Sequence, residues 1–216
     1  MQGADMGKSL VWLAAELSLL AAAPAVARGG DEYACDYCEQ FPYSRFRFQI
    51  EGGPTITQGY GARYLDNGTN VGLGVTWQPT PKRPFALRAD AMYQSFAARQ
   101  LLLEQASANF GTHIDEGSVH MWGADLDAEF DLKLNTWTRL YFLAGGGWYN
   151  QQNNFRQNGV LVERNTTGTR FAKNAGLGVE FANGGDVFFF IDVRYMRFSV
   201  NGQHVDFVPI RLGIRF

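Results

Sequence analysis

The last stretch of the chain, Val205–Phe216 with the sequence VDFVPIRLGIRF, decides the fold. Every second residue from Val208 to Phe216 is apolar, and two arginines lie among the intervening residues. A strand with this period has one apolar face and one polar face. About 9–11 tilted residues cross a bilayer as a strand, and a lipid-facing strand alternates in this way. A half-buried strand of a soluble sandwich fits equally well, so the other strands must decide between the two.

The alternation closes on a C-terminal phenylalanine. Leu212, Ile214 and Phe216 resemble the assembly signal by which insertion machinery recognises bacterial outer-membrane barrels. Asp192–Phe216 resembles the final hairpin of the small outer-membrane β-barrel family, which contains the OmpA-type transmembrane domain. The resemblance implies an all-β fold, an eight-stranded antiparallel up-and-down transmembrane β-barrel in the bacterial outer membrane. It also implies two partners, the outer-membrane lipids and the barrel-assembly machinery.

Composition bounds the possibilities. The 216 residues suffice for one domain, and 14% of them are aromatic. The net charge of -2 shows no basic excess that would indicate nucleic-acid binding. The mean hydropathy of -0.20, with no apolar run of 18 residues past the N-terminus, excludes a helical membrane protein. A barrel is not excluded, because its hydrophobicity is spread over every second residue.

The N-terminus reads as a signal peptide over residues 1–27. Lys8 precedes the apolar run Leu10–Leu20, and Ala25-Val26-Ala27 is a small-x-small cleavage site. Asp5 and Glu16 depart from the pattern, the first only if translation starts at Met1 rather than Met6. The alternative is an amphipathic helix of the mature protein. We expect an exported chain with a periplasmic segment, residues 28–43, before a barrel over residues 44–216.

Two cysteines, Cys35 and Cys38, follow the cleavage site. In an exported chain they indicate a small-loop disulfide or two free thiols. A zinc site would need further ligands, and a haem attachment would need histidine at position 39, which is Glu39. The sequence therefore predicts no metal and no cofactor.

The alternation recurs upstream, which gives eight strands in all. We predict strands over 44–51, 70–77, 85–96, 118–132, 138–149, 171–181, 187–198 and 205–216. The connections at 78–84, 133–137 and 182–186 are short, whereas 52–69, 97–117 and 150–170 are predicted to be long loops. Outer-membrane barrels have this asymmetry, with short periplasmic turns, longer outside loops and periplasmic termini. Leu101–Leu103, within the second long loop, is predicted to be a strand extension or an interfacial patch.

The polar faces of these strands carry balanced charges. Asp125, Asp127, Glu129 and Asp131 alternate along one strand, and such acids need cationic partners when buried. The predicted lumen charges are Arg45, Arg47, Glu51, Arg88, Asp90, Asp125, Asp127, Glu129, Arg139, Glu180, Asp192, Arg194, Arg211 and Arg215. A barrel of about eight strands has an interior only just wide enough for side chains. We therefore predict a salt-bridged, largely closed lumen.

The opposite faces are apolar, with aromatic residues near the strand ends, as in interfacial girdles. The predicted girdle comprises Trp77, Tyr93, Trp122, Trp148, Tyr149 and Tyr195. A soluble eight-stranded ligand carrier has the reverse arrangement, with an apolar interior and a charged exterior. The two faces therefore argue against that class.

No complete catalytic set is evident, so the predicted function is non-enzymatic: a structural or adhesive role in which the long loops meet an unknown extracellular partner. One alternative is a conduit or binder for apolar compounds, with a cavity roofed by Leu101–Leu103. The other is a lipid-modifying enzyme, because Ser118 and His120 share the lipid-facing side. The lipid A deacylase family has histidine before serine in its motif, and here the order is reversed.

Overall fold

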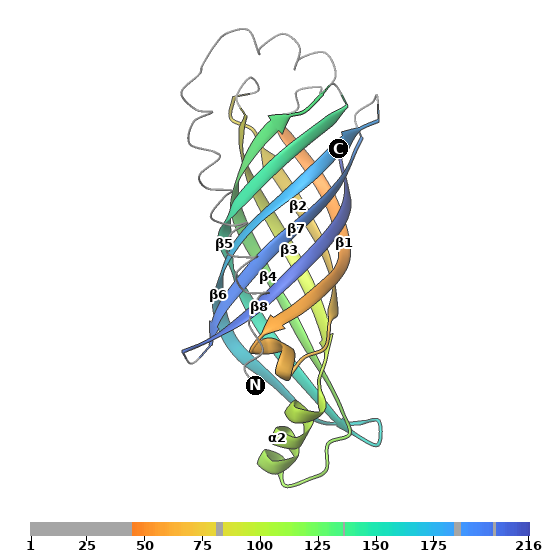
Figure 1. Ribbon diagram of the computed structural model, residues 1–216. Coiled ribbons are helices and arrows are strands. Elements are labelled where there is room, and N and C mark those ends of the chain that lie inside the picture. The colour runs from red at the N-terminus through yellow and green to blue at the C-terminus, as the bar shows by residue number, and fades with distance from the viewer. Residues whose placement is uncertain (1–44, 81–83, 136, 184–186, 201) are drawn as a thin grey trace, which may run out of the picture.

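The computed structural model describes residues 45–80, 84–135, 137–183, 187–200 and 202–216. The predicted signal peptide, the segment 28–43 and both cysteines lie outside the described residues. Eight antiparallel strands close into a barrel in sequence order (Figure 1). They are β1 Phe46–Gly59, β2 Gly68–Trp77, β3 Phe85–Ala97, β4 Glu116–Lys133, β5 Thr138–Gln157, β6 Val160–Ala182, β7 Phe188–Val200 and β8 Gln203–Arg215. The predicted fold class is confirmed.

The C-terminal strand closes the barrel against the first one. β1 and β8 pair antiparallel, with Gln49 opposite Arg215. Phe48 and Phe216 extend this pairing, because each backbone N–H donates to the carbonyl of the other at 2.8 and 2.9 Å. Barrel closure leaves no free sheet edge along the paired stretch.

Burial alternates along the strands as the sequence pattern predicts. In β1, Arg47, Gln49 and Glu51 are buried, and the intervening Phe48 and Ile50 are exposed. The polar faces therefore line the lumen and the apolar faces cover the outside. Exposed side chains from every strand form a belt of aromatic and aliphatic residues, including Phe46, Leu73, Trp77, Phe85, Leu126, Trp148, Leu177, Phe189, Ile191 and Leu212.

Residues 150–170, predicted to be a long loop, are instead strand. β5 and β6 continue past the rest of the barrel and meet at the two-residue turn Asn158-Gly159, whose φ angles are 50° and 75°. A type I′ hairpin needs positive φ at both central residues, which Asn-Gly supplies. The prediction was wrong because asparagine, glutamine and threonine occupy both faces here, so no apolar alternation marks the strand.

The other two predicted long loops are shorter than expected. β1 continues through Gly52-Gly53-Pro54 to Gly59, and a single 3-10 turn, η3 Gly61–Arg63, leads to β2. Between β3 and β4 lies α2, Gln100–Phe110, which ends at Gly111 with φ 66°. Leu101–Leu103 is therefore helical and forms no strand extension. None of the helices in the described part of the chain is long and apolar enough to cross a membrane.

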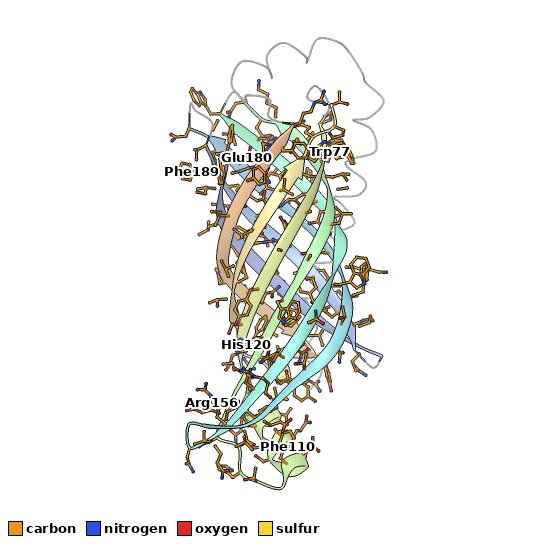
Figure 2. The ribbon with its side chains drawn as sticks, turned by 180° about the vertical axis from the view of Figure 1, so that it is seen from behind. Trp77, Phe110, His120, Arg156, Glu180 and Phe189 are labelled. Atoms are coloured by element: carbon orange, nitrogen blue, oxygen red, sulfur yellow. The ribbon has the colours of Figure 1, made fainter. Side chains whose placement is uncertain are left out.

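The two ends of the barrel differ. Figure 1 shows α2 and the tip of the β5–β6 hairpin at one end, called the α2 end below. Figure 2 shows Phe110 and Arg156 at that end, with Trp77 and Glu180 at the opposite one. The connections at 78–84, 134–137 and 183–187 join strands at the opposite end.

Candidate functional site

The lumen contains a network of buried charges. Among the described residues, six arginines and eight carboxylates are buried: Arg47, Arg88, Arg139, Arg194, Arg211 and Arg215, with Glu51, Asp90, Asp125, Asp127, Glu129, Asp131, Glu180 and Asp192. We call this set the lumen ion-pair network. It draws on every strand except β2, whose inward positions include Gly72 and Gly74. Glu51 packs over Gly72, and Asp90 with Gln49 over Gly74, so bare backbone makes room for charged side chains.

The middle of the network is organised around Arg88, which is fully buried. Its guanidinium donates to Asp90 at 2.9 Å and to Asp192 at 3.1 Å, and also pairs with Glu51. Arg194 bonds Asp127 at 2.6 Å and Asp90 at 2.7 Å. Two arginines thus share one aspartate, and planar guanidinium groups suit such multiple pairing in a dry site.

A second group lies toward the end opposite α2, around Glu180. This carboxylate accepts from Arg139 at 2.5 Å, Arg215 at 2.7 Å and Arg47 at 3.4 Å. Arg215 also reaches Glu129 at 3.1 Å. Every member of this group is at least nine-tenths buried, so each charge depends on protein partners in place of water.

The structure places all but one of the predicted lumen charges inside the barrel. The exception is Arg45, which precedes β1 and is exposed. The alternation of the strand assigns Arg45 to the inward face, but the residue lies beyond the last layer of lumen side chains. Asp131 joins the network through Arg139 at 2.8 Å. Gln49 joins it as well, accepting from Arg215 at 2.9 Å, and was missed because it is uncharged.

Tyr149, predicted to belong to the interfacial girdle, instead points into the lumen. It is 1% exposed, and its hydroxyl donates to Asp125. Successive side chains of a strand point to opposite faces. Because Trp148 of β5 points outward, Tyr149 must point inward. The other aromatic residues of the predicted girdle, Trp77, Tyr93, Trp122, Trp148 and Tyr195, lie on the outer surface, of which Tyr195 is half-buried.

Between the charges and α2, the lumen is filled by apolar side chains. The lumen apolar cluster consists of Leu65, Met92, Phe96, Val119, Met121, Tyr149, Ala172, Met196, Phe198 and Phe207. The Phe96 and Phe207 rings lie 4.9 Å apart, and Phe198 meets Phe207 edge-on at 5.7 Å. This cluster was not predicted, because large apolar residues on the inward face interrupt the polar alternation.

α2 covers this cluster. Its Leu102 packs against the lumen apolar cluster and also against a second cluster made of Ala106, Ile114 and Phe155. Leu103 packs against the second cluster as well. Of the predicted roof Leu101–Leu103, only Leu102 contacts the lumen apolar cluster, and Leu101 is exposed. The space that Leu102 covers is filled by side chains.

Beyond the barrel wall, β4, β5 and β6 continue as a three-stranded sheet, with α2 on its inner face. We call this sheet the protrusion. β5 lies in its centre, paired with β4 as far as Glu116 opposite Arg156. β6 pairs with β7 only from Ala172 onward, so residues 160–171 pair with β5 on one side and, within the described chain, have no strand on the other side (Figure 2).

The predicted nucleophile pair does come together on the outer surface of β4. Ser118 Oγ lies 3.0 Å from His120 Nε2. His120 Nδ1 lies 2.8 Å from the Tyr93 hydroxyl and 3.1 Å from Ser95 Oγ on β3. The imidazole is thus held at both nitrogens, although by hydroxyl groups and not by a carboxylate.

The predicted assembly residues are also on the outer surface. Leu212, Ile214 and Phe216 are exposed by 55%, 37% and 49%, and the Phe216 ring lies 6.4 Å from that of Phe48. Recognition of these residues by insertion machinery stays a prediction.

Comparisons with known proteins support the fold. No family model matches the chain, and no curated protein sequence matches it. Among solved structures, Neisserial surface protein A is 12% identical, with a TM-score of 0.54 over 80% of this chain and 96% of that one.

Two further structures are similar at lower scores. Ail, the attachment invasion locus protein of Yersinia pestis, is 16% identical, with a TM-score of 0.48 over 79% of this chain and 97% of its own. The outer-membrane enzyme PagL is 15% identical, with a TM-score of 0.41 over 78% of this chain and 97% of its own. At such identities only the fold is shared, and one fold hosts unrelated functions. The resemblance predicted from the C-terminal strand is nevertheless confirmed: the chain has the fold of the small eight-stranded outer-membrane β-barrels.

Proposed function

We propose that this chain is a non-enzymatic outer-membrane barrel with a closed lumen, whose protrusion binds an extended segment of an extracellular polypeptide. In this proposal the α2 end faces the outside and both termini lie in the periplasm. The exposed apolar belt supports a place in the bilayer, since water would not favour so much contiguous apolar surface. The short turns at the end opposite α2 support the orientation.

Two layers support a closed lumen. The lumen ion-pair network fills the interior from its middle toward the end opposite α2, and the lumen apolar cluster fills the α2 end. The apolar cluster also occupies the space in which an apolar ligand or conduit would lie. We therefore favour an interaction role over transport.

The observation that carries the interaction role is the open edge of β6. An unpaired strand edge exposes backbone N–H and C=O groups, and an extended peptide can add to it as a further strand. Natural proteins usually protect such an edge with charges, proline or a covering element. Here Val160, Leu161 and Val162 are exposed at 68%, 45% and 39%, and residues 160–171 contain no proline. Charges occur at Glu163, Arg164 and Arg170, but residues 165–169 between them are uncharged.

The test places a lysine on the edge strand and, as a control, on its neighbour. Thr166 of β6 lies opposite Gln152 of the central strand β5, so Thr166→Lys and Gln152→Lys add the same charge to neighbouring positions. Peptides selected from a displayed library against the refolded full-length barrel are expected to bind Thr166→Lys at least about tenfold more weakly than wild type. Gln152→Lys should bind nearly as well as wild type.

Amide hydrogen exchange locates the bound peptide. Binding is expected to protect about every second amide of residues 160–171, because these N–H groups face the added strand and the others face β5. Protection confined to α2 or to the connection at 60–67 would reject the edge as the binding surface, as would equal loss of affinity in both lysine variants.

A second candidate function is ester hydrolysis at Ser118, favoured by its 3.0 Å contact with His120. Serine activated by an adjacent imidazole is a nucleophile for acyl transfer, and its outward position would suit a lipid ester. The test measures hydrolysis of a long-chain p-nitrophenyl ester by the refolded barrel. Hydrolysis that is abolished in both Ser118→Ala and His120→Gln would establish this candidate; equal background rates in all three proteins would leave the non-enzymatic function.

A further inference from the structure

Two cations face each other on the outer surface of the barrel. Lys173 of β6 is directly opposite Arg197 of β7 in the strand register. Their chain neighbours Ala172, Asn174, Met196 and Phe198 are buried, so both cations lie on the outward face. Like charges directly opposite each other in a sheet destabilise the pair. The position therefore favours a bound anion.

The protein supplies only part of the neutralising charge. Arg197 bonds Asp206 of β8 through Nε at 2.9 Å and through Nη2 at 3.2 Å, and Nη2 also donates to the Tyr195 hydroxyl at 2.5 Å. The guanidinium is therefore held in place. Lys173 is exposed, and within the described chain it forms no salt bridge, which leaves one uncompensated positive charge.

The pair lies at the α2-end margin of the apolar belt. Along β7 the outward residues Phe189, Ile191 and Val193 are exposed and apolar, and Tyr195 and Arg197 follow them. Two residues before Lys173 on β6, the ring of Phe171 packs edge to face against that of Trp148 of β5, with the ring centroids 5.2 Å apart. Aromatic residues and cations occur together at the headgroup level of a bilayer.

We propose that Lys173 and Arg197 bind the phosphate group of a lipid headgroup in the outer leaflet. The proposal rests on the membrane orientation given under the proposed function. Phosphate presents several strong acceptor oxygens, so one group can accept from both the ammonium and the guanidinium. Trp148 and Phe171 then contact the lipid beside its headgroup, which fixes the position of that lipid against β6.

The test measures lipid retention by the full chain refolded in phosphatidylcholine vesicles with or without phosphatidic acid. Unboiled-versus-boiled gel mobility first confirms that each variant is folded and inserted. Native mass spectrometry of the extracted barrel is expected to show phosphatidic acid retained in preference to phosphatidylcholine. Lys173→Gln should lower the apparent affinity for phosphatidic acid about tenfold, the effect of losing one charge-assisted contact.

The matched control is Arg164→Gln, which removes an exposed cation from the protrusion of the same strand. It should retain phosphatidic acid as wild type does, whereas equal loss in both variants would mean diffuse attraction and overturn the site. No preference for phosphatidic acid in an inserted barrel would also overturn it, without affecting the proposed function. A barrel that fails to insert would reject the proposed function itself.

Inorganic phosphate separates the two sources of the anion. Added to the barrel in a neutral detergent without lipid, it should give no protection against thermal unfolding. If inorganic phosphate protected the barrel against thermal unfolding as much as phosphatidic acid does, and Lys173→Gln abolished that protection, the site would bind soluble phosphate. This result would overturn the lipid assignment.

Discussion

Arg88→Met is expected to be the most destabilising single substitution in the barrel. Arg88 is fully buried and pairs with Glu51, Asp90 and Asp192. Carboxylates already outnumber arginines eight to six among the described lumen residues, so removal of a guanidinium increases an existing imbalance. Breaking a buried ion pair by removing one partner costs about 3–5 kcal/mol. We expect a loss of that size in the free energy of unfolding, measured by urea titration in detergent micelles.

Two comparison variants make this result specific. Asp127→Leu should lower the free energy of unfolding by less than Arg88→Met does. Arg194 keeps its ion pair with Asp90 at 2.7 Å, and the substitution removes one of the carboxylates that are in excess over the arginines. Asp66→Asn breaks an exposed ion pair, in which the Arg99 and Asp66 side chains are 48% and 52% exposed. It should lower the free energy of unfolding by less than about 1 kcal/mol. If Arg88→Met were no more destabilising than Asp66→Asn, the lumen charges would have to be hydrated, which contradicts a packed interior.

Gly147→Val is expected to have the second largest effect. A Cβ atom at Gly147 would lie 2.1 Å from the carbonyl oxygen of Ala124 and 2.3 Å from Oδ1 of Asp125. Neither atom can move freely, because one is backbone and the other belongs to a buried carboxylate bonded by Tyr149. Overpacking of this kind costs about 1–3 kcal/mol. We expect a value near the upper limit, because the new side chain would push β5 away from β4. The same urea titration measures it.

The control for this substitution is Gly168→Val in the protrusion. No heavy atom lies within 4 Å of the Cβ position at Gly168, so the same change meets open space. It should change the free energy of unfolding by no more than about 0.5 kcal/mol. Equal effects at the two glycines would show that strand propensity, and not the space above Gly147, determines the result.

The strand order and the two faces of the barrel could be predicted from sequence because a period of two applies to every strand. Where both faces are polar, the period carries no information, and residues 150–170 were therefore read as a loop. The Asn158-Gly159 turn was the available signal, since Asn-Gly between two polar segments can still indicate a hairpin.

The lumen charges were predictable because an arginine or a carboxylate on the inward face must find a partner. Which charges pair could not be predicted, since Arg47 and Glu180 are 133 residues apart in the sequence. Their contact depends on barrel closure and strand register. The lumen apolar cluster was missed for a different reason: the alternation places Met196 and Phe207 on the same face as Arg194 and Arg211, but they are apolar, and the lumen was predicted from charged residues.

The ends of the strands were least predictable. Arg45 fits the inward parity but lies outside the last lumen layer, because parity gives the face and not the depth. Ser118 and His120 were placed on one face by parity, yet their contacts with Tyr93 and Ser95 of β3 needed the register between strands.

The closed lumen is tested most directly by single-channel conductance of the refolded barrel, residues 28–216, in a planar bilayer. Unboiled-versus-boiled gel mobility establishes that the inserted protein is folded. Charges that are paired with each other and an apolar cluster at the α2 end leave no continuous water path, so no steady conductance is expected from the heat-modifiable species. A steady, reproducible conductance would mean that the lumen charges line water, and it would contradict the closed lumen.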